Sequence, residues 1–196
     1  MINMSILNDL PRDTVIFISG TPCTGKTTVA TDLNDYLSEN GFNSRLIKIN
    51  DFAFENDLVL GEDPDKLYKV IDIDKLNDCL NEEIGKNNDA VLIVEGHLSH
   101  LCEGADKMIV LRLNPSILKE RLEERNYTES KIQENLEAEA LAVCSAEAYD
   151  IYGDNTNEID VSDKSIEEIR DMILAIASDN LQSPIGSIDF MDWFLN

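Results

Sequence analysis

Positively charged residues are scarce in this sequence of 196 residues. It holds 16 Lys and Arg against 39 Asp and Glu, for a formal net charge of −23 at pH 7. A surface of that charge repels free nucleic acid at long range and attracts basic proteins. We therefore expect no strong direct nucleic-acid binding, although solubility or a salty cytoplasm would explain the same charge.

Long apolar runs are also absent. No stretch approaches the roughly 20 apolar residues that a membrane-spanning helix needs. The first residues, MINMSILNDLPRD, lack the basic start and the long apolar segment of a signal peptide. We expect a cytoplasmic protein without a membrane partner.

Cysteines at metal-binding or redox spacing are missing too. The four cysteines are scattered at Cys23, Cys79, Cys102 and Cys144, and no C-x-x-C pair occurs. This spacing favours neither a zinc site nor a redox motif. We expect reduced thiols that serve as small buried groups.

The clearest motif that is present is TVIFISGTPCTGKTT at 14–28. Residues 14–19 form an apolar, β-branched run that is typical of a buried strand, and a helix pattern begins near residue 26. Between them, residues 20–27 match the phosphate loop G-x-x-x-x-G-K-[ST]. The strand before it and the helix after it are the context in which this motif binds a nucleotide.

Each residue type in this loop has a physical role. Gly20 and Gly25 permit backbone torsions that a Cβ resists, so several N–H groups can turn toward one phosphate. The helix N-terminus adds the positive end of its dipole at the same point. Lys26 is predicted to bridge the β- and γ-phosphates of ATP, and the Thr27 hydroxyl is predicted to help hold Mg²⁺.

Strand and helix patterns alternate along the rest of the chain. Strands are predicted at 44–49, 90–94, 107–113 and 158–161, and helices at 50–57, from 72 or 74 to 85, 115–125, 128–149 and 165–177, while 59–69 is predicted to be irregular. This alternation is typical of an α/β phosphate-loop fold with a five-stranded parallel sheet and helices on both faces. We expect one domain over 1–180. A tail follows over 181–196, and its Phe190, Trp193 and Phe194 are expected to pack back on the domain.

Polar residues also follow two other predicted strands, at Asn50-Asp51 and at Glu95-Gly96-His97. Ligands of parallel sheets bind at the carboxyl ends of the strands. Glu95 is predicted to hold Mg²⁺ through a water, and the alternative is a capping or solvated carboxylate. His97 either orients or activates a water for ATP hydrolysis, or lies on the surface without a role. We expect no role for His100.

Five of the few cations lie close together, at Arg112, Lys119, Arg121, Arg125 and Lys131. Arginines stabilise the charge that phosphoryl transfer redistributes. The alternative is ordinary pairing with glutamates one helical turn away. We expect Lys119 and Arg121 to form surface pairs and Arg125, at the break between two helices, to belong to the site.

Several segments together resemble one known family. GTPCTGKTT, INDFA, VIDIDKL, VEGH, IVLR and RNYTESKIQENLEAE occur in the order and spacing of the adenylate kinase isoenzyme six family. That family is also described as nuclear adenylate kinase-like ribosome-assembly factors, and the chain resembles its archaeal members. The likeness spans residues 14–169.

This resemblance implies a nucleoside-monophosphate kinase-like fold, with a monophosphate-binding segment near 50–73 and a lid near 124–134. It implies phosphoryl transfer from ATP to a monophosphate, usually AMP, together with ATPase activity. It also implies a role in maturation of the small ribosomal subunit and 16S rRNA processing, through transient binding of the universal small-subunit ribosomal protein eleven. By matching motifs, the ATP site comprises Cys23, Gly25, Lys26, Thr27, Thr28 and the lid residue Arg125. We expect Asp51 and Arg112 to contact the acceptor substrate.

The chain departs from its eukaryotic relatives at two places. They read Asp-x-His where this chain has Glu95-Gly96-His97, a change that bears on metal geometry. They also carry a basic residue at the position of Phe54. Residues 50–70 offer only Lys66 and Lys69 to an AMP phosphate, so the departure bears on AMP transfer more than on ATP binding.

The sequence therefore predicts an adenylate or other nucleoside-monophosphate kinase with ATPase activity, using ATP and Mg²⁺. One alternative is an ATP-gated assembly factor with little kinase turnover, whose acidic surface covers a basic ribosomal protein. Another is a small-molecule kinase of the same fold.

Overall fold

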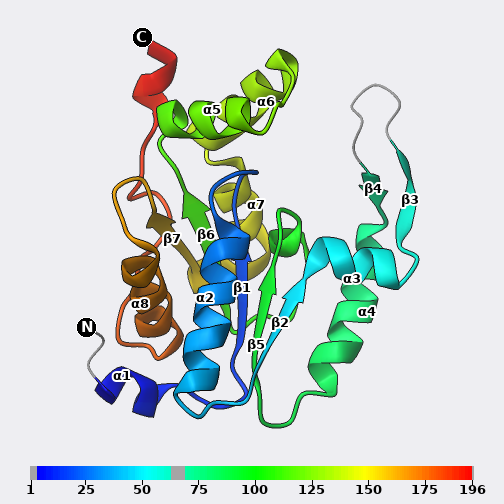
Figure 1. Ribbon diagram of the computed structural model, residues 1–196, viewed down its shortest axis with the longest axis vertical. Coiled ribbons are helices and arrows are strands. Elements are labelled where there is room, and N and C mark those ends of the chain that lie inside the picture. Colours follow the sequence, from blue (N-terminus) through cyan, green and yellow to red (C-terminus); the bar gives the residue numbers. More distant parts are fainter. Residues whose placement is uncertain (1–3, 63–68, 196) are drawn as a thin grey trace.

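Five parallel strands form the centre of the fold, in the order β2-β5-β1-β6-β7 (Figure 1). The computed structural model describes residues 4–62 and 69–195. The strands of this sheet are β1 (Val15–Ser19), β2 (Ser44–Lys48), β5 (Val91–Glu95), β6 (Lys107–Arg112) and β7 (Thr156–Asp160). The predicted five-stranded parallel sheet is confirmed.

Both faces of the sheet are covered by helices. One core contains side chains from α2 (Lys26–Glu39), α5 (Pro115–Glu124), α6 (Glu129–Ala140) and α8 (Ile166–Ala177). The other contains side chains from α3 (Ile49–Glu55), α4 (Ile73–Gly85) and α7 (Val143–Tyr152). The shorter helices are α1 (Met4–Asp9) and the 3₁₀ turns η1 (Ser99–Leu101), η2 (Gly153–Asn155) and η3 (Met191–Leu195).

The central strand β1 is apolar at nearly every position because it is buried on both faces of the sheet. All five of its residues are buried. Ile16 and Ile18 belong to the first core, and Val15 and Phe17 belong to the second. Alternate side chains of a strand point to opposite faces, so a strand between two helical layers needs apolar residues on both.

Residues 59–69 were expected to be irregular, and that prediction is wrong for both ends of the segment. β3 (Val59–Glu62) and β4 (Lys69–Ile71) form an antiparallel pair apart from the main sheet (Figure 1). The register shifts between Val59 and Gly61, so a bulge accommodates the glycine that made the segment look irregular. Lys66 lies outside the described residues.

The long helix expected over 128–149 is two helices, α6 and α7. They meet at Ala142, whose φ is +54°. Near this break, the carbonyl of Glu139 accepts a hydrogen bond of 2.7 Å from Nη2 of Arg112. The same carbonyl also accepts a bond of 3.1 Å from the backbone N–H of Ala142, so a local turn and a contact from a distant strand meet at the end of α6.

The C-terminal segment packs on the domain, as expected for its aromatic residues. The carbonyl of Ser183 accepts a hydrogen bond of 2.8 Å from the backbone N–H of Glu158 in β7. Trp193 packs against the first core, and the Phe190 ring lies 5.3 Å from Cζ of Arg112. The side chain of Phe194 lies outside the described part of the chain.

The helices in the described part of the chain are too short or too polar to cross a membrane. Within 4–62 and 69–195, none combines the length and the apolar character that a bilayer span requires.

Candidate active site

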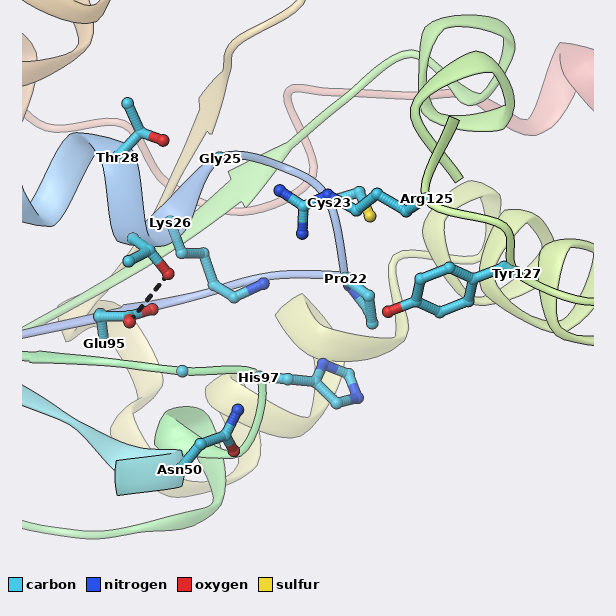
Figure 2. Close-up of a pocket in the computed structure, with 12 residues that line it drawn as sticks. Pro22, Cys23, Gly25, Lys26, Thr28, Asn50, Glu95, His97, Arg125 and Tyr127 are labelled. Atoms are coloured by element: carbon cyan, nitrogen blue, oxygen red, sulfur yellow. Dashed lines mark hydrogen bonds between the residues drawn. The ribbon is translucent and has the colours of Figure 1, made fainter. Parts of the chain in front are cut away.

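One pocket lies at the carboxyl ends of β1, β2 and β5 (Figure 2). Its volume is about 240 Å³. It is formed by the loop between β1 and α2, the start of α3, the loop after β5 and the turn between α5 and α6. The residues that line it are Pro22, Cys23, Gly25, Lys26, Thr27, Thr28, Asn50, Glu95, Gly96, His97, Arg125 and Tyr127. Eight of these are site residues that the sequence predicted: Cys23, Gly25, Lys26, Thr27, Thr28, Glu95, His97 and Arg125.

The phosphate loop has the backbone that its glycines predict. Gly20 has φ of +140°, and a Cβ there would lie 2.5 Å from the carbonyl oxygen of Leu111. Gly25 has φ of +97° and precedes α2 without a side-chain cap. The first N–H groups of α2 therefore lack side-chain acceptors at the pocket, which is the arrangement in which a helix N-terminus binds an anion.

Lys26 is buried at the base of this loop. Its Nζ donates hydrogen bonds of 2.9 Å to the carbonyls of Gly20 and Thr21. Burial lowers the pKa of this ammonium, and the nearby Glu95 carboxylate opposes that shift. An ammonium has three donors, so two bonds leave one for a phosphate oxygen.

Thr27 and Glu95 form the candidate magnesium site. The hydroxyl of Thr27 donates a hydrogen bond of 2.9 Å to Oε1 of Glu95, and Figure 2 shows this bond as the dashed line that ends at Glu95. Glu95 is only 5% exposed, and within the described residues no Lys or Arg forms an ion pair with it. A buried carboxylate beside a hydroxyl fits Mg²⁺, which takes one or two protein oxygens and completes its shell with water and phosphate.

His97 lies beside the same loop. Its Nδ1 is 3.2 Å from the carbonyl oxygen of Gly20. A carbonyl only accepts, so Nδ1 carries the proton and Nε2 has a free lone pair. Partial desolvation lowers the pKa of the imidazole, and the charge of Lys26 lowers it further. The ring is therefore neutral near pH 7 and able to accept a proton from water.

The turn between α5 and α6 closes the opposite side of the pocket. Asn126 adopts φ of +58° at this turn, and the residues on either side of it, Arg125 and Tyr127, line the pocket. Figure 2 shows the Arg125 side chain extending toward Cys23 and the phosphate loop. Arg125 is exposed and has no ion-pair partner within the described ranges, so its charge is available to a phosphate.

Two predicted substrate residues lie elsewhere. Arg112 is 1% exposed, does not line the pocket, and pairs with Glu139 and Glu158. The prediction that Arg112 binds substrate is therefore wrong, because its donors are used inside the core. Asp51 is exposed on α3 and does not line the pocket, whereas its neighbour Asn50 does.

Other side chains near the site differ from expectation. Arg121 was expected to form a surface pair, yet its Nη1 donates a 3.2 Å hydrogen bond to the carbonyl of Cys23. Lys119 does form the expected surface pair with Glu123, at 3.8 Å. Tyr127 was not singled out, although its place two residues after Arg125 in the R-x-Y motif was a usable signal. Burial raises the pKa of its phenol, so it acts at the pocket as a neutral group.

Comparisons with known proteins found a matching family model and several archaeal relatives. The model of the family described as "AAA domain" matches residues 16–142. A protein of Methanothermobacter thermautotrophicus described as "Putative adenylate kinase" is 41% identical over 181 residues, which cover 92% of this chain and 99% of that protein. One of Methanococcus maripaludis with the same description is 38% identical, over 91% of this chain and 96% of that protein.

Solved structures of small kinases share the fold. A gluconokinase from Sinorhizobium meliloti has a TM-score of 0.51 at 16% identity, covering 86% of this chain and 94% of its own. A thymidylate kinase from Candida albicans has a TM-score of 0.53 at 16% identity, covering 86% and 92%. At identities this low, the structural similarity shows the phosphate-loop kinase fold but says nothing about the substrate. The matches to the archaeal proteins cover nearly the whole chain at much higher identity, so they show the family as well as the fold. The chain belongs to their adenylate kinase-like family of AAA-domain proteins.

Proposed function

We propose that this protein is a cytoplasmic adenylate kinase, transferring a phosphoryl group from ATP to a nucleoside monophosphate, with ATPase activity. The observation that carries the proposal is the meeting of four groups at one pocket. These are the phosphate loop with Lys26, the Thr27–Glu95 pair, His97 and Arg125. Family membership adds independent support.

Each group has a role in aligning the triphosphate. The backbone N–H groups of the loop and the first turn of α2 would bind the phosphates, and Lys26 would neutralise the charge between the β and γ groups. Thr27 and Glu95 would hold Mg²⁺, whose charge offsets that of the phosphate oxygens. Arg125 would reach the transferring group from the opposite side.

The two reactions make different demands on the site. A monophosphate acceptor oxygen is already ionised, so transfer needs alignment and charge stabilisation rather than a base. Hydrolysis needs a positioned water, and the free Nε2 of neutral His97 is suited to accept its proton. Phe54 is exposed, with 66% of its surface accessible, at a position where the resemblance places a cation. Because the AMP phosphate lacks that cation here, the substitution favours hydrolysis relative to AMP transfer.

A coupled assay with ATP, Mg²⁺ and AMP, CMP, UMP or no acceptor tests the proposal. We expect ADP formation without acceptor and faster turnover with AMP than with CMP or UMP. Adding gluconate and shikimate tests the small-molecule alternative. Turnover with gluconate or shikimate but with no nucleoside monophosphate would contradict the proposal. So would the absence of ADP formation under every condition, with or without an acceptor.

His97→Ala is expected to slow ATP hydrolysis by roughly a hundredfold, the contribution of a positioned general base. Phosphoryl transfer to AMP should stay within about threefold of the wild type, because it needs no base. Both rates are measured on one preparation, with the melting temperature as the control for folding. Equal losses in the two rates would rule out the assignment of His97.

Glu95→Gln is expected to raise the Mg²⁺ concentration for half-maximal activity by about tenfold or more, because the amide keeps the volume but loses the charge. A magnesium titration at saturating ATP measures this shift. Glu103→Gln is the matched control, since Glu103 is exposed and outside the pocket. An unchanged magnesium curve for Glu95→Gln would remove Glu95 from the metal site.

A role in ribosome assembly is a second candidate function. The net charge of −23 favours a basic partner, and the resemblance to the isoenzyme six family suggests the universal small-subunit ribosomal protein eleven during 16S rRNA processing. Pull-down of the tagged protein from lysate, with and without ATP, tests this candidate. We expect the pull-down to recover this ribosomal protein in an amount that depends on ATP. Its absence both with and without ATP would count against the role.

A further inference from the structure

His100 is buried three residues after His97, and both of its ring nitrogens are in hydrogen bonds. Its side chain is 2% exposed. Nδ1 lies 2.7 Å from Oγ of Ser19, and Nε2 lies 2.8 Å from Oε2 of Glu147 on α7. We propose that Glu147, His100 and Ser19 form a positioning chain that holds His97 against the phosphate loop. This inference rests on the proposed role of His97 in hydrolysis.

The proton positions in this chain follow from the chemistry of its ends. A carboxylate only accepts, so Nε2 of His100 carries a proton toward Glu147. Burial lowers the pKa of His100, so the ring is neutral near pH 7 and has no second ring proton. Nδ1 must then accept the hydroxyl proton of Ser19. Glu147 therefore selects the His100 tautomer, and the tautomer orients the Ser19 hydroxyl.

Ser19 connects this chain to His97. Its Oγ has one proton, which is shared between Nδ1 of His100 at 2.7 Å and the carbonyl oxygen of His97 at 3.2 Å, the longer and weaker of the two contacts. The next residue, Gly20, accepts the bond from Nδ1 of His97. The backbone and the ring of His97 are thus held by two consecutive residues at the end of β1. A shift of Ser19 would move both contacts, and a displacement near 1 Å at a reacting group costs roughly a hundredfold in rate.

The arrangement resembles a nucleophilic Ser-His-Glu set, but its burial excludes that chemistry. Ser19 is 0% exposed and does not line the pocket, so no substrate carbonyl or phosphate reaches its oxygen. The loop also keeps other attachments to β1. Ser99 donates a 3.0 Å bond to the carbonyl of Ile18, so loss of the His100 contacts would leave the loop folded and displace it locally.

Glu147→Ala is the direct test, because the Glu147 side chain is 49% exposed and its loss creates no buried cavity. The protein has only two histidines, so nitrogen NMR of histidine-labelled protein reports each ring. We expect opposite tautomers in the wild type, Nδ1–H for His97 and Nε2–H for His100. In Glu147→Ala, the Nδ1–H population of His97 should fall, and ATP hydrolysis should slow about tenfold with KM for ATP unchanged.

Two further variants make the test specific. Glu147→Gln retains an oxygen that accepts from Nε2–H, so it should restore most of the His97 tautomer and of the hydrolysis rate. Asp150→Ala removes an exposed acid from the same helix and should change neither. A wild-type His97 tautomer in Glu147→Ala, or an equal effect of Asp150→Ala, would overturn the inference. If the wild type hydrolyses no ATP, the proposed ATPase activity fails, and the NMR result still decides whether the chain positions His97.

Discussion

Lys26→Ala is expected to reduce both ATP hydrolysis and phosphoryl transfer by at least roughly a hundredfold, the loss typical of removing one preorganised charge donor. Lys26 is the buried cation of the phosphate loop, with two of its donors on loop carbonyls. Its removal takes away the positive charge that we propose faces the γ-phosphate, and it leaves the carbonyls of Gly20 and Thr21 without that donor. Steady-state kinetics of both reactions measure the loss.

Two comparisons separate a catalytic loss from a folding loss. Lys119→Ala removes an exposed lysine whose partner Glu123 lies 3.8 Å away, and it should leave both rates within about twofold of the wild type. Calorimetry with magnesium-loaded ATP reports binding separately from turnover. A Lys26→Ala protein that melts like the wild type and keeps more than a tenth of either rate would contradict the assignment.

Arg112→Ala is expected to destabilise the fold by about 3–5 kcal/mol, the cost of leaving buried charges without their partner. Arg112 pairs with Glu139 at 2.8 Å and with Glu158 at 2.5 Å, and all three side chains are almost fully buried. The same guanidinium also bonds the carbonyl of Glu139 at the end of α6. A melting temperature lower by roughly 6–20 °C would correspond to this loss.

Arg45→Ala is the matched control for this prediction. Arg45 forms an ion pair of 2.6 Å with Glu83, but its side chain is 50% exposed. Solvent screens such pairs, so its loss should cost at most about 1 kcal/mol. Denaturant unfolding of the two variants gives the comparison. Similar losses for Arg112→Ala and Arg45→Ala would show that the buried network contributes little.

Glu139 also links the buried Arg112 network to the phosphate loop. Besides Arg112, its carboxylate accepts a hydrogen bond from the hydroxyl of Thr21 in the phosphate loop. The end of α6, the end of β6 and the phosphate loop therefore meet at one buried carboxylate. The arginine that the sequence suggested as a substrate ligand supports the loop through Glu139 instead.

Local sequence was sufficient for the parts of the site that lie within one loop. The spacing of Gly20, Gly25, Lys26 and Thr27 identified the phosphate loop, because the motif needs those residue types at those positions. Glu95 and His97 were located by their place after an apolar strand. The pocket contains all of these except Gly20, whose carbonyl accepts from Lys26 just beneath it.

Contacts between distant segments could not be predicted in this way. Arg112 and Arg125 both lie near the end of a helix or strand, and their local sequences do not distinguish them. The carboxylates that neutralise Arg112 are Glu139 and Glu158, which lie 27 and 46 residues away. No role was expected for His100, because its partners Ser19 and Glu147 are 81 and 47 residues away in the sequence.

The sequence by itself determined the layered α/β fold, the order along the chain of the five strands of its main sheet and the position of the phosphate loop. These depend on short-range patterns of apolar residues and on backbone torsions that neighbouring residues control. Only the tertiary structure decided which charged side chains reach the pocket and which are neutralised inside the core. That choice depends on packing, since burial makes an unpaired charge costly and a distant partner can satisfy it.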